Sequence, residues 1–161
     1  MGIVLNHRSF VIERELPGSP GHAFRFWSDH ALKRRWTSCH PDWQVLEDRL
    51  DFRVDGSERL RWLMPDGTEQ DMLAHYLDIF PRQHIVYAYT MRSGGRSISS
   101  SLVTVEFTAK AGKTMMTFTE QAAFAGAADG EIRESGTGEG FERLREAMAA
   151  MPEMAPLPQD A

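Results

Sequence analysis

Short runs of alternating apolar and polar residues fill the middle of the chain, from 43 to 124. Alternation with a period of two is typical of β-strands that bury one face. Turn-forming residues separate these runs at fairly regular spacing, and each can adopt the backbone angles of a tight turn. The breaks are Asp55-Gly56, Pro65-Asp66-Gly67, Pro81-Arg82, Ser93-Gly94-Gly95 and Ala111-Gly112. This segment therefore predicts six strands in an antiparallel meander.

In several of these strands the alternation also identifies the buried face. The residues expected on that face are Leu50, Phe52, Val54, Leu60, Trp62, Met64, Val103, Val105, Phe107, Met116 and Phe118. The strand from 71 to 79 is apolar in both phases, so alternation leaves the orientation of His75 and Tyr76 open.

The chain before the meander predicts one strand and two short helices. Residues 7–15 alternate and are followed by a Pro-Gly turn, which is typical of a strand. Ser19 can cap a helix whose first position is Pro20, and Asp29 can cap a second one. The apolar side chains expected to pack inward from these helices are Ala23, Phe26, Trp27, Leu32 and Trp36.

The last predicted element is a long helix from about Asp129 to Met151. Its sheet-facing stripe is expected to be Ile132, Gly136, Gly140, Leu144 and Met148, with Phe141 beside it. Each glycine on this stripe weakens the helix by about 1 kcal/mol relative to alanine. Either the backbone approaches the sheet closely at these positions, or room is left there for something else.

A curved antiparallel sheet needs a cover for its apolar concave face, and only the long helix is large enough to supply one. We therefore predict an α+β helix-grip fold, a seven-stranded antiparallel sheet wrapped around a long C-terminal helix, with two short helices after strand 1. Residues 1–151 are expected to form this domain, and 152–161, with three prolines, a flexible C-terminal tail. A tapered gap between sheet and helix is a natural site for an apolar ligand.

Composition narrows the classes of partner. The formal net charge is -5, and the only dense basic run is 33–35, which is expected to be a solvated helix face. Neither nucleic acid nor a membrane is therefore an expected partner. One cysteine, Cys39, cannot form an internal disulfide, and the chain shows no signal-peptide pattern and no apolar run of membrane-spanning length. These features favour the cytoplasm.

Several motifs, taken in order, resemble the SRPBCC (START-like) superfamily. Residues 19–36 are similar to its opening, in which a proline-started helix precedes a short helix that ends in tryptophan. The run 51–56, Asp-Phe-Arg-Val-Asp-Gly, is similar to the hairpin motif Asp-x-Arg-Val-Gly-Gly, with Asp55 in place of the first glycine. Residues 118–124 and 133–137 resemble a bacterial subset grouped with homologues of the activator of a heat-shock-protein ATPase. The resemblance implies a cavity but no particular ligand, because lipid carriers, hormone receptors, polyketide cyclases and cochaperone domains share this scaffold.

Glu120 is the sharpest candidate for chemistry. It follows Phe118 by two residues and Met116 by four, so period-two geometry points its carboxylate toward the cavity. A buried carboxyl group there can exchange a proton or anchor a polar group of a ligand. The alternatives are that solvent or an arginine satisfies Glu120 near the strand end, or that a bulge reverses the phase.

The residues expected to bind a ligand are Trp62, Met64, Tyr76, Tyr89, Met116, Phe118, Glu120, Gly136 and Gly140. Each aromatic or methionine side chain among them is equally compatible with ordinary core packing. Arg133 and Glu134 are candidates for a ligand contact or a structural salt bridge, or are simply solvated charges near a helix start.

No metal site and no cofactor are expected. Paired metal ligands recur at helix-face or Cys-x-x-Cys spacing, and five histidines show neither spacing with one another or with Cys39. They are His22, His30, His40, His75 and His84. Adjacent Cys39 and His40 make a poor nucleophile pair, since neighbouring side chains seldom face one another. The Gly-x-Gly-x-Gly run 136–140 lies inside a helical pattern, so it is not a dinucleotide loop.

Three functions remain open. The first is a binding module that carries, sequesters or senses a small apolar or amphipathic molecule. The second is an enzyme of cyclase or dehydratase type with Glu120 as general acid/base and Tyr76, Tyr89 or His75 as a second polar group. The third, by family analogy only, is a cochaperone-like domain with an exposed apolar patch and a chaperone partner. The sequence leaves a homodimer open.

Overall fold

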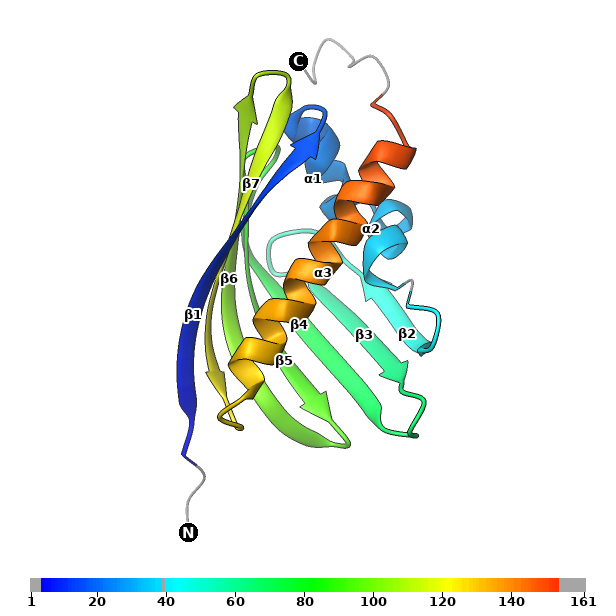
Figure 1. The fold of residues 1–161 in the computed structure, drawn as a ribbon, viewed down its shortest axis with the longest axis vertical. Helices are drawn as coiled ribbons and strands as arrows, with labels where there is room; N and C mark the ends of the chain where they lie inside the picture. The colour runs from blue at the N-terminus through cyan, green and yellow to red at the C-terminus, as the bar shows by residue number, and fades with distance from the viewer. Residues whose placement is uncertain (1–3, 39, 154–161) are drawn as a thin grey trace.

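The computed structural model describes residues 4–38 and 40–153, and it confirms the predicted order of elements (Figure 1). The elements are β1 (Asn6–Pro17), α1 (Pro20–Ser28), α2 (His30–Thr37), β2 (Gln44–Leu50), β3 (Ser57–Leu63), β4 (Glu69–Phe80), β5 (His84–Ser93), β6 (Arg96–Lys110), β7 (Lys113–Phe124) and α3 (Asp129–Ala150). Within the described ranges, no helix has both the length and the apolar character needed to cross a membrane.

The seven strands form one antiparallel sheet in the order β1-β7-β6-β5-β4-β3-β2. The N-terminal strand β1 pairs with the last strand β7 over its whole length, from Asn6 opposite Phe124 to Pro17 opposite Lys113. The sheet curves, and α3 crosses its concave side diagonally while α1 and α2 lie toward one end (Figure 1). The predicted α+β helix-grip architecture is therefore confirmed.

Both predicted helix caps are present. The Ser19 hydroxyl accepts a hydrogen bond from the His22 backbone N–H at 3.2 Å, and Pro20 occupies the first turn. The Asp29 carboxylate accepts from the Leu32 N–H at 3.2 Å. The indole of Trp36 donates to the Phe26 carbonyl at 2.8 Å, which ties the two short helices together.

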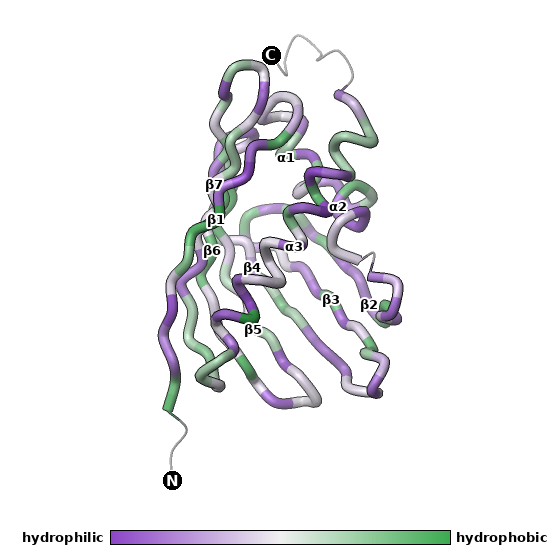
Figure 2. The backbone as a smooth tube through the Cα atoms, in the orientation of Figure 1, coloured by the Kyte–Doolittle hydropathy of each residue, from purple (hydrophilic) through white to green (hydrophobic). Residues whose placement is uncertain are grey.

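The strands alternate between hydrophobic and hydrophilic positions, whereas most of α3 is hydrophilic or neutral (Figure 2). The buried face contains most of the side chains predicted for it: Leu60, Trp62, Val103, Val105, Phe107, Met116 and Phe118. Tyr76 also faces the core, and His75 is exposed, which settles the orientation of the ambiguous strand.

Three predictions about the buried stripes are wrong, because Val54, Ile132 and Gly136 are exposed. Val54 is 44% exposed, because β2 ends at Leu50 and the chain turns before Val54. Ile132 is 67% exposed, because positions four residues apart drift by about 40° around a helix at each step. Three such steps separate Ile132 from Leu144, so the two side chains point in directions about 120° apart around the helix. The apolar contact of α3 therefore comes mainly from its C-terminal half.

The chain after α3 is described as far as Glu153. Glu153 accepts hydrogen bonds from the backbone N–H and the hydroxyl of Ser19, so the chain just after α3 contacts the start of α1. The remainder of the predicted tail, 154–161, lies outside the described residues, as does Cys39.

The turn 51–56 connects β2 and β3 and is held by backbone hydrogen bonds to β4. Asp55 donates its N–H to the Tyr76 carbonyl at 2.9 Å, and the Tyr76 N–H donates to the Gly56 carbonyl at 3.0 Å. Asp55 adopts a φ of 68°, so it takes the left-handed conformation for which glycine is better suited. At Gly56 the constraint is space, because a Cβ there would lie 2.2 Å from the Asp51 carbonyl oxygen.

We expect Gly56→Ala to lower the free energy of unfolding by about 3 kcal/mol or more, at the upper end of overpacking effects, because backbone atoms cannot move aside as a side chain can. Gly67→Ala is the matched control, since Gly67 also lies in a turn but a Cβ there would meet no atom within 4 Å. Its left-handed φ should cost only about 1 kcal/mol. Urea unfolding followed by tryptophan fluorescence measures both, and equal losses would contradict the steric explanation.

Candidate functional site

A cleft of about 400 Å³ lies between the concave face of the sheet and α3, within the range typical of small-molecule sites. Strands β3, β4, β5, β6 and β7 and all three helices contribute to its walls. Its aromatic lining residues are Trp27, Trp36, Trp43, Trp62, Tyr87, Tyr89, Phe118 and Phe141. Ile132 lines the same cleft while 67% exposed, so the cleft opens to solvent beside the first turns of α3.

The cleft brings together most of the predicted ligand-binding residues. Those that line it are Trp62, Tyr89, Phe118, Glu120, Gly136 and Gly140. Three others do not belong to its lining. Met64 lies just beyond the end of β3, Tyr76 directs its hydroxyl to Lys33 and Glu58, and Met116 is fully buried in the core.

The glycines of α3 distinguish the two explanations offered by the sequence. A Cβ at Gly136 would meet no atom within 4 Å, and one at Gly140 only the Arg143 guanidinium at 3.6 Å. Gly140 is buried and therefore leaves room beside the cleft, whereas Gly136 lines the cleft at an exposed position. A close approach occurs instead at Gly130, where a Cβ would lie 2.4 Å from the Arg8 side chain.

Glu120 lies at the centre of the first polar cluster in the cleft. Its carboxylate is fully buried, and Oε2 accepts hydrogen bonds from the Tyr89 hydroxyl at 2.8 Å and the Ser101 hydroxyl at 2.7 Å. The Arg133 guanidinium lies 3.4 Å from the same oxygen. Arg133 also donates to the Tyr89 hydroxyl and to Ser99, both at 2.7 Å. The cluster therefore links β5, β6 and β7 to α3.

The other carboxylate oxygen of Glu120 has no such partners. Oε1 is buried and makes no hydrogen bond with any residue in the described part of the chain. An unmet buried acceptor is unfavourable by about 1–3 kcal/mol, and by more when it carries charge. The sequence left open that an arginine satisfies Glu120. Arg133 does contact its carboxylate, but only at Oε2, so Oε1 stays without a partner among the described residues.

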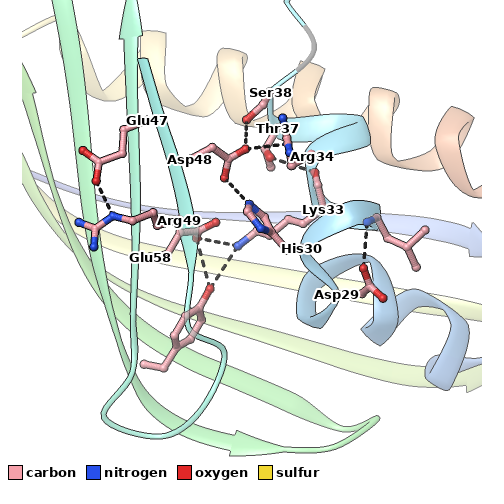
Figure 3. A network of polar contacts seen from close by, with 12 residues as sticks. Asp29, His30, Lys33, Arg34, Thr37, Ser38, Glu47, Asp48, Arg49 and Glu58 are labelled. Carbon is pink, nitrogen blue, oxygen red and sulfur yellow. Dashed lines mark hydrogen bonds and ion pairs between the residues drawn. The ribbon is translucent and has the colours of Figure 1, made fainter. Parts of the chain in front are cut away.

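A second polar cluster, absent from the sequence predictions, lies elsewhere in the same cleft. Lys33 of α2 forms a buried ion pair with Glu58 of β3, with 2.7 Å between Nζ and Oε1 (Figure 3). The Tyr76 hydroxyl lies 3.2 Å from each of these atoms. Lys33 and Glu58 both line the cleft. The interpretation of 33–35 as a solvated face is thus wrong for Lys33, whose side chain is only 5% exposed.

The sequence did contain a signal for this second cluster. Lys33 precedes Trp36 by three residues, so the two share a helix face. Glu58 is in phase with Leu60 and Trp62, which places it on the buried face of β3. Period-two alternation also places Ser99 and Ser101 of the first cluster on the buried face of β6, because they are in phase with the buried Val103.

Further polar contacts attach α2 and α3 around the cleft. Asp48 of β2 lies 2.8 Å from both His30 and the Ser38 hydroxyl at the two ends of α2 (Figure 3). On the opposite side, the β1 residue Arg8 binds Glu134 of α3 at 2.8 Å. Glu134 is therefore structural, and the groove between β1 and α3 is lined mostly by charged residues.

A row of three tyrosines runs between the two polar clusters. The ring centroids of Tyr76 and Tyr87 are 5.9 Å apart, as are those of Tyr87 and Tyr89. Burial raises the pKa of Tyr76 to about 12, and burial together with neighbouring acidic groups raises the pKa of Tyr87 and of Tyr89 well above the ordinary value. All three hydroxyls therefore remain protonated near neutral pH and can act as hydrogen-bond donors.

Lys33 remains charged despite its burial. Burial alone would lower the pKa of its ammonium group, but the charge of Glu58 and the contact with Tyr76 reverse the effect, so the pKa is raised. Arrangements of this kind neutralise each buried charge locally and leave an apolar cleft with hydrogen-bonding groups at fixed points.

These three tyrosines are the only ones in the chain, so their ionisation can be followed directly. We expect no tyrosinate absorbance at 295 nm near pH 10 in the folded protein. The unfolded chain releases these protons near pH 10 while the folded chain keeps them, so stability falls as pH rises above 10. The slope for three groups is about 4 kcal/mol per pH unit. A spectrophotometric titration with parallel unfolding curves measures both effects, and a tyrosine titrating near pH 10 without unfolding would contradict them.

The Lys33–Glu58 pair should also show strong coupling. Replacing one partner, as in Lys33→Met or Glu58→Met, leaves a buried charge unpaired and should lower the free energy of unfolding by about 3–5 kcal/mol. The double variant should lose less than either single variant, because it leaves no unpaired charge. Thermal and urea unfolding test this cycle. Additive losses would show that the two side chains contribute independently.

Comparisons with known proteins agree with this architecture. The family model described as "Activator of Hsp90 ATPase homolog 1-like protein" matches residues 18–153. An uncharacterised protein from Rhizobium leguminosarum is 42% identical, with 91% of this chain and 97% of that chain covered and a TM-score of 0.87. Mll3558 from Rhizobium loti is 37% identical, with 90% and 99% covered and a TM-score of 0.84.

More distant structures share the fold alone. An AHSA1-like protein from Aeromonas hydrophila is 16% identical, with 92% of this chain and 100% of that chain covered and a TM-score of 0.68. No curated protein matches the chain. The motifs, the helix-grip architecture and the match over 18–153 together show that the chain belongs to the family of Activator of Hsp90 ATPase homolog 1-like proteins, within the SRPBCC type of fold.

Proposed function

We propose that the protein binds a small apolar or amphipathic molecule in the cleft between the sheet and α3, and so carries, sequesters or senses it. The observation that carries this proposal is the open space beside Gly140, which is buried and lines the cleft. Alanine would make the helix more stable at this position by about 1 kcal/mol. Glycine there keeps space in the cleft although it makes the helix less stable, which favours a bound ligand over close packing.

The lining supports the same proposal. Eight lining residues are aromatic, and such side chains hold apolar molecules through large contact areas with few directional requirements. The two polar clusters add a small number of fixed hydrogen-bonding groups, which is the usual composition of a small-molecule site. A location in the cytoplasm is part of this proposal.

One contact also favours a second candidate, an enzyme of cyclase or dehydratase type. Of the three groups considered as a partner for Glu120, Tyr89 is in direct hydrogen-bonding contact with it. A buried carboxylate with one free oxygen can act as a general base, and the Tyr89 hydroxyl holds its other oxygen in place. Product formation that is lost in Glu120→Gln while ligand binding persists would identify this activity. A chaperone partner and a homodimer remain predictions, the first by family analogy only.

Filling the cleft tests the binding proposal. We expect wild-type protein to bind the fluorescent probe N-phenyl-1-naphthylamine, and Gly140→Leu to weaken that binding by at least about tenfold, or 1.4 kcal/mol. Gly140 is buried and lines the cleft, so a leucine side chain there takes up part of its volume. Fluorescence titration measures the affinities, and native mass spectrometry shows whether the purified protein retains a ligand.

Two control variants separate occupancy from helix stability. Gly140→Ala makes the same gain in helix propensity without filling the cleft, and Ser135→Leu adds the same side chain at an exposed position of α3 outside the cleft. Both should bind the probe within about twofold of wild type. Equal binding by all variants would place the probe elsewhere, and no binding by wild type would contradict the proposal.

A further inference from the structure

We propose that the cleft selects uncharged ligands that carry a hydroxyl or N–H group, and that this group donates a hydrogen bond to Oε1 of Glu120. This inference rests on the proposed function, because it names the class of molecule that the same cleft would take. Three features of the cleft support it: the unpartnered oxygen, the balance of buried charge and the shape of the aromatic walls.

The geometry around Glu120 shows that its free oxygen is an acceptor. Two hydroxyls donate to Oε2, and the guanidinium of Arg133 lies beside the same oxygen. Donors that converge in this way stabilise the ionised carboxylate. Oε1 is then a charged acceptor, buried and without a partner among the described residues. A molecule that supplies a donor there recovers a charge-assisted hydrogen bond, which is worth about 1.5–3 kcal/mol.

The neighbouring side chains cannot supply that donor. Tyr89 and Ser101 each have one hydroxyl hydrogen, and both hydrogens are directed to Oε2. Arg133 directs Nη1 to the Tyr89 hydroxyl and Nη2 to Ser99. In this arrangement no described side chain donates to Oε1, which leaves that position to an occupant of the cleft.

The charges that line the cleft already balance. Its three cationic and three anionic lining residues are Lys33, Arg133, Arg143, Glu58, Glu120 and Asp129. Four of them form two buried ion pairs, Lys33 with Glu58 and Arg133 with Glu120. A charged ligand placed beside these two pairs would bring an additional buried charge that neither pair neutralises, which is strongly unfavourable. Neutral ligands avoid this cost.

The walls favour a flat ligand. Trp27 and Phe118 each contact Phe141 of α3, with ring centroids 6.1 and 5.0 Å apart, and the tyrosine row extends the aromatic surface along β5. Stacked and edge-on contacts with these rings suit a planar aromatic molecule. A flat ring system with a terminal hydroxyl fits both the walls and Oε1.

Glu120→Gln changes the hydrogen-bonding character of this point without changing its size. Because Tyr89 and Ser101 both donate to the Oε2 side, the amide oxygen of glutamine is expected to remain there. The amide NH₂ then replaces Oε1 and presents donors to the ligand in place of an acceptor. The preference for a donor over an acceptor on the ligand should therefore weaken or reverse.

Three probes with one skeleton test the inference: biphenyl-4-methanol as a neutral donor, 4-acetylbiphenyl as a neutral acceptor, and biphenyl-4-carboxylate as an anion. Their affinities are measured by displacement of N-phenyl-1-naphthylamine from the full-length protein. We expect wild type to bind the alcohol at least about tenfold more tightly than the ketone or the carboxylate. In Glu120→Gln the ratio of alcohol to ketone affinity should fall by at least about tenfold.

Glu139→Gln is the matched control, because it makes the same change of charge at an exposed position of α3 outside the cleft. Its alcohol-to-ketone ratio should equal that of wild type. The wild-type ranking needs no variant, so it tests the inference even if Glu120→Gln does not fold.

The outcomes separate the two proposals. If wild type binds neither N-phenyl-1-naphthylamine nor any biphenyl, the proposed function fails and the inference fails with it. If the three biphenyls bind equally well, if the carboxylate binds best, or if Glu120→Gln keeps the wild-type ratio, the inference is overturned while ligand binding stands.

Discussion

A single helix has to cover the concave face of a seven-stranded sheet, and the rest of the structure follows from that mismatch. The helix α3 packs along β1 and β7, where ion pairs such as Arg8–Glu134 attach it, and its C-terminal half packs against α2. The apolar faces of β3, β4 and β5 are thus left beyond its reach. The cleft forms there, and aromatic side chains line it in place of a packed helix.

The same mismatch explains why charged groups occur so deep in this protein. A cleft open at one side offers a place where polar side chains can be useful, but each charge must be neutralised because the walls are apolar. Lys33 and Glu58 neutralise each other on one side, as do Arg133 and Glu120 on another. Glu120 keeps one acceptor oxygen free within this balance, and the indole N–H groups of Trp27 and Trp62 are also without partners among the described residues.

The fold is shared with proteins as distant as 16% in identity, so it says little about function by itself. What this chain does depends on side chains attached to the common scaffold. Gly140 leaves space, the tyrosine row adds aromatic surface, and the Glu120 cluster supplies fixed hydrogen-bonding groups.

Local patterns determined the order of elements, the turns, the helix caps and most of the buried face, because alternation and capping involve residues close together in the chain. They also placed Glu120 on the inner side of β7 and suggested space at Gly136 and Gly140. Only the tertiary structure decided which inward side chains meet. Lys33 and Glu58 are 25 residues apart, and Tyr89 and Glu120 are 31 apart. Such contacts depend on how far the sheet curves and where α3 crosses it, and no local pattern specifies either.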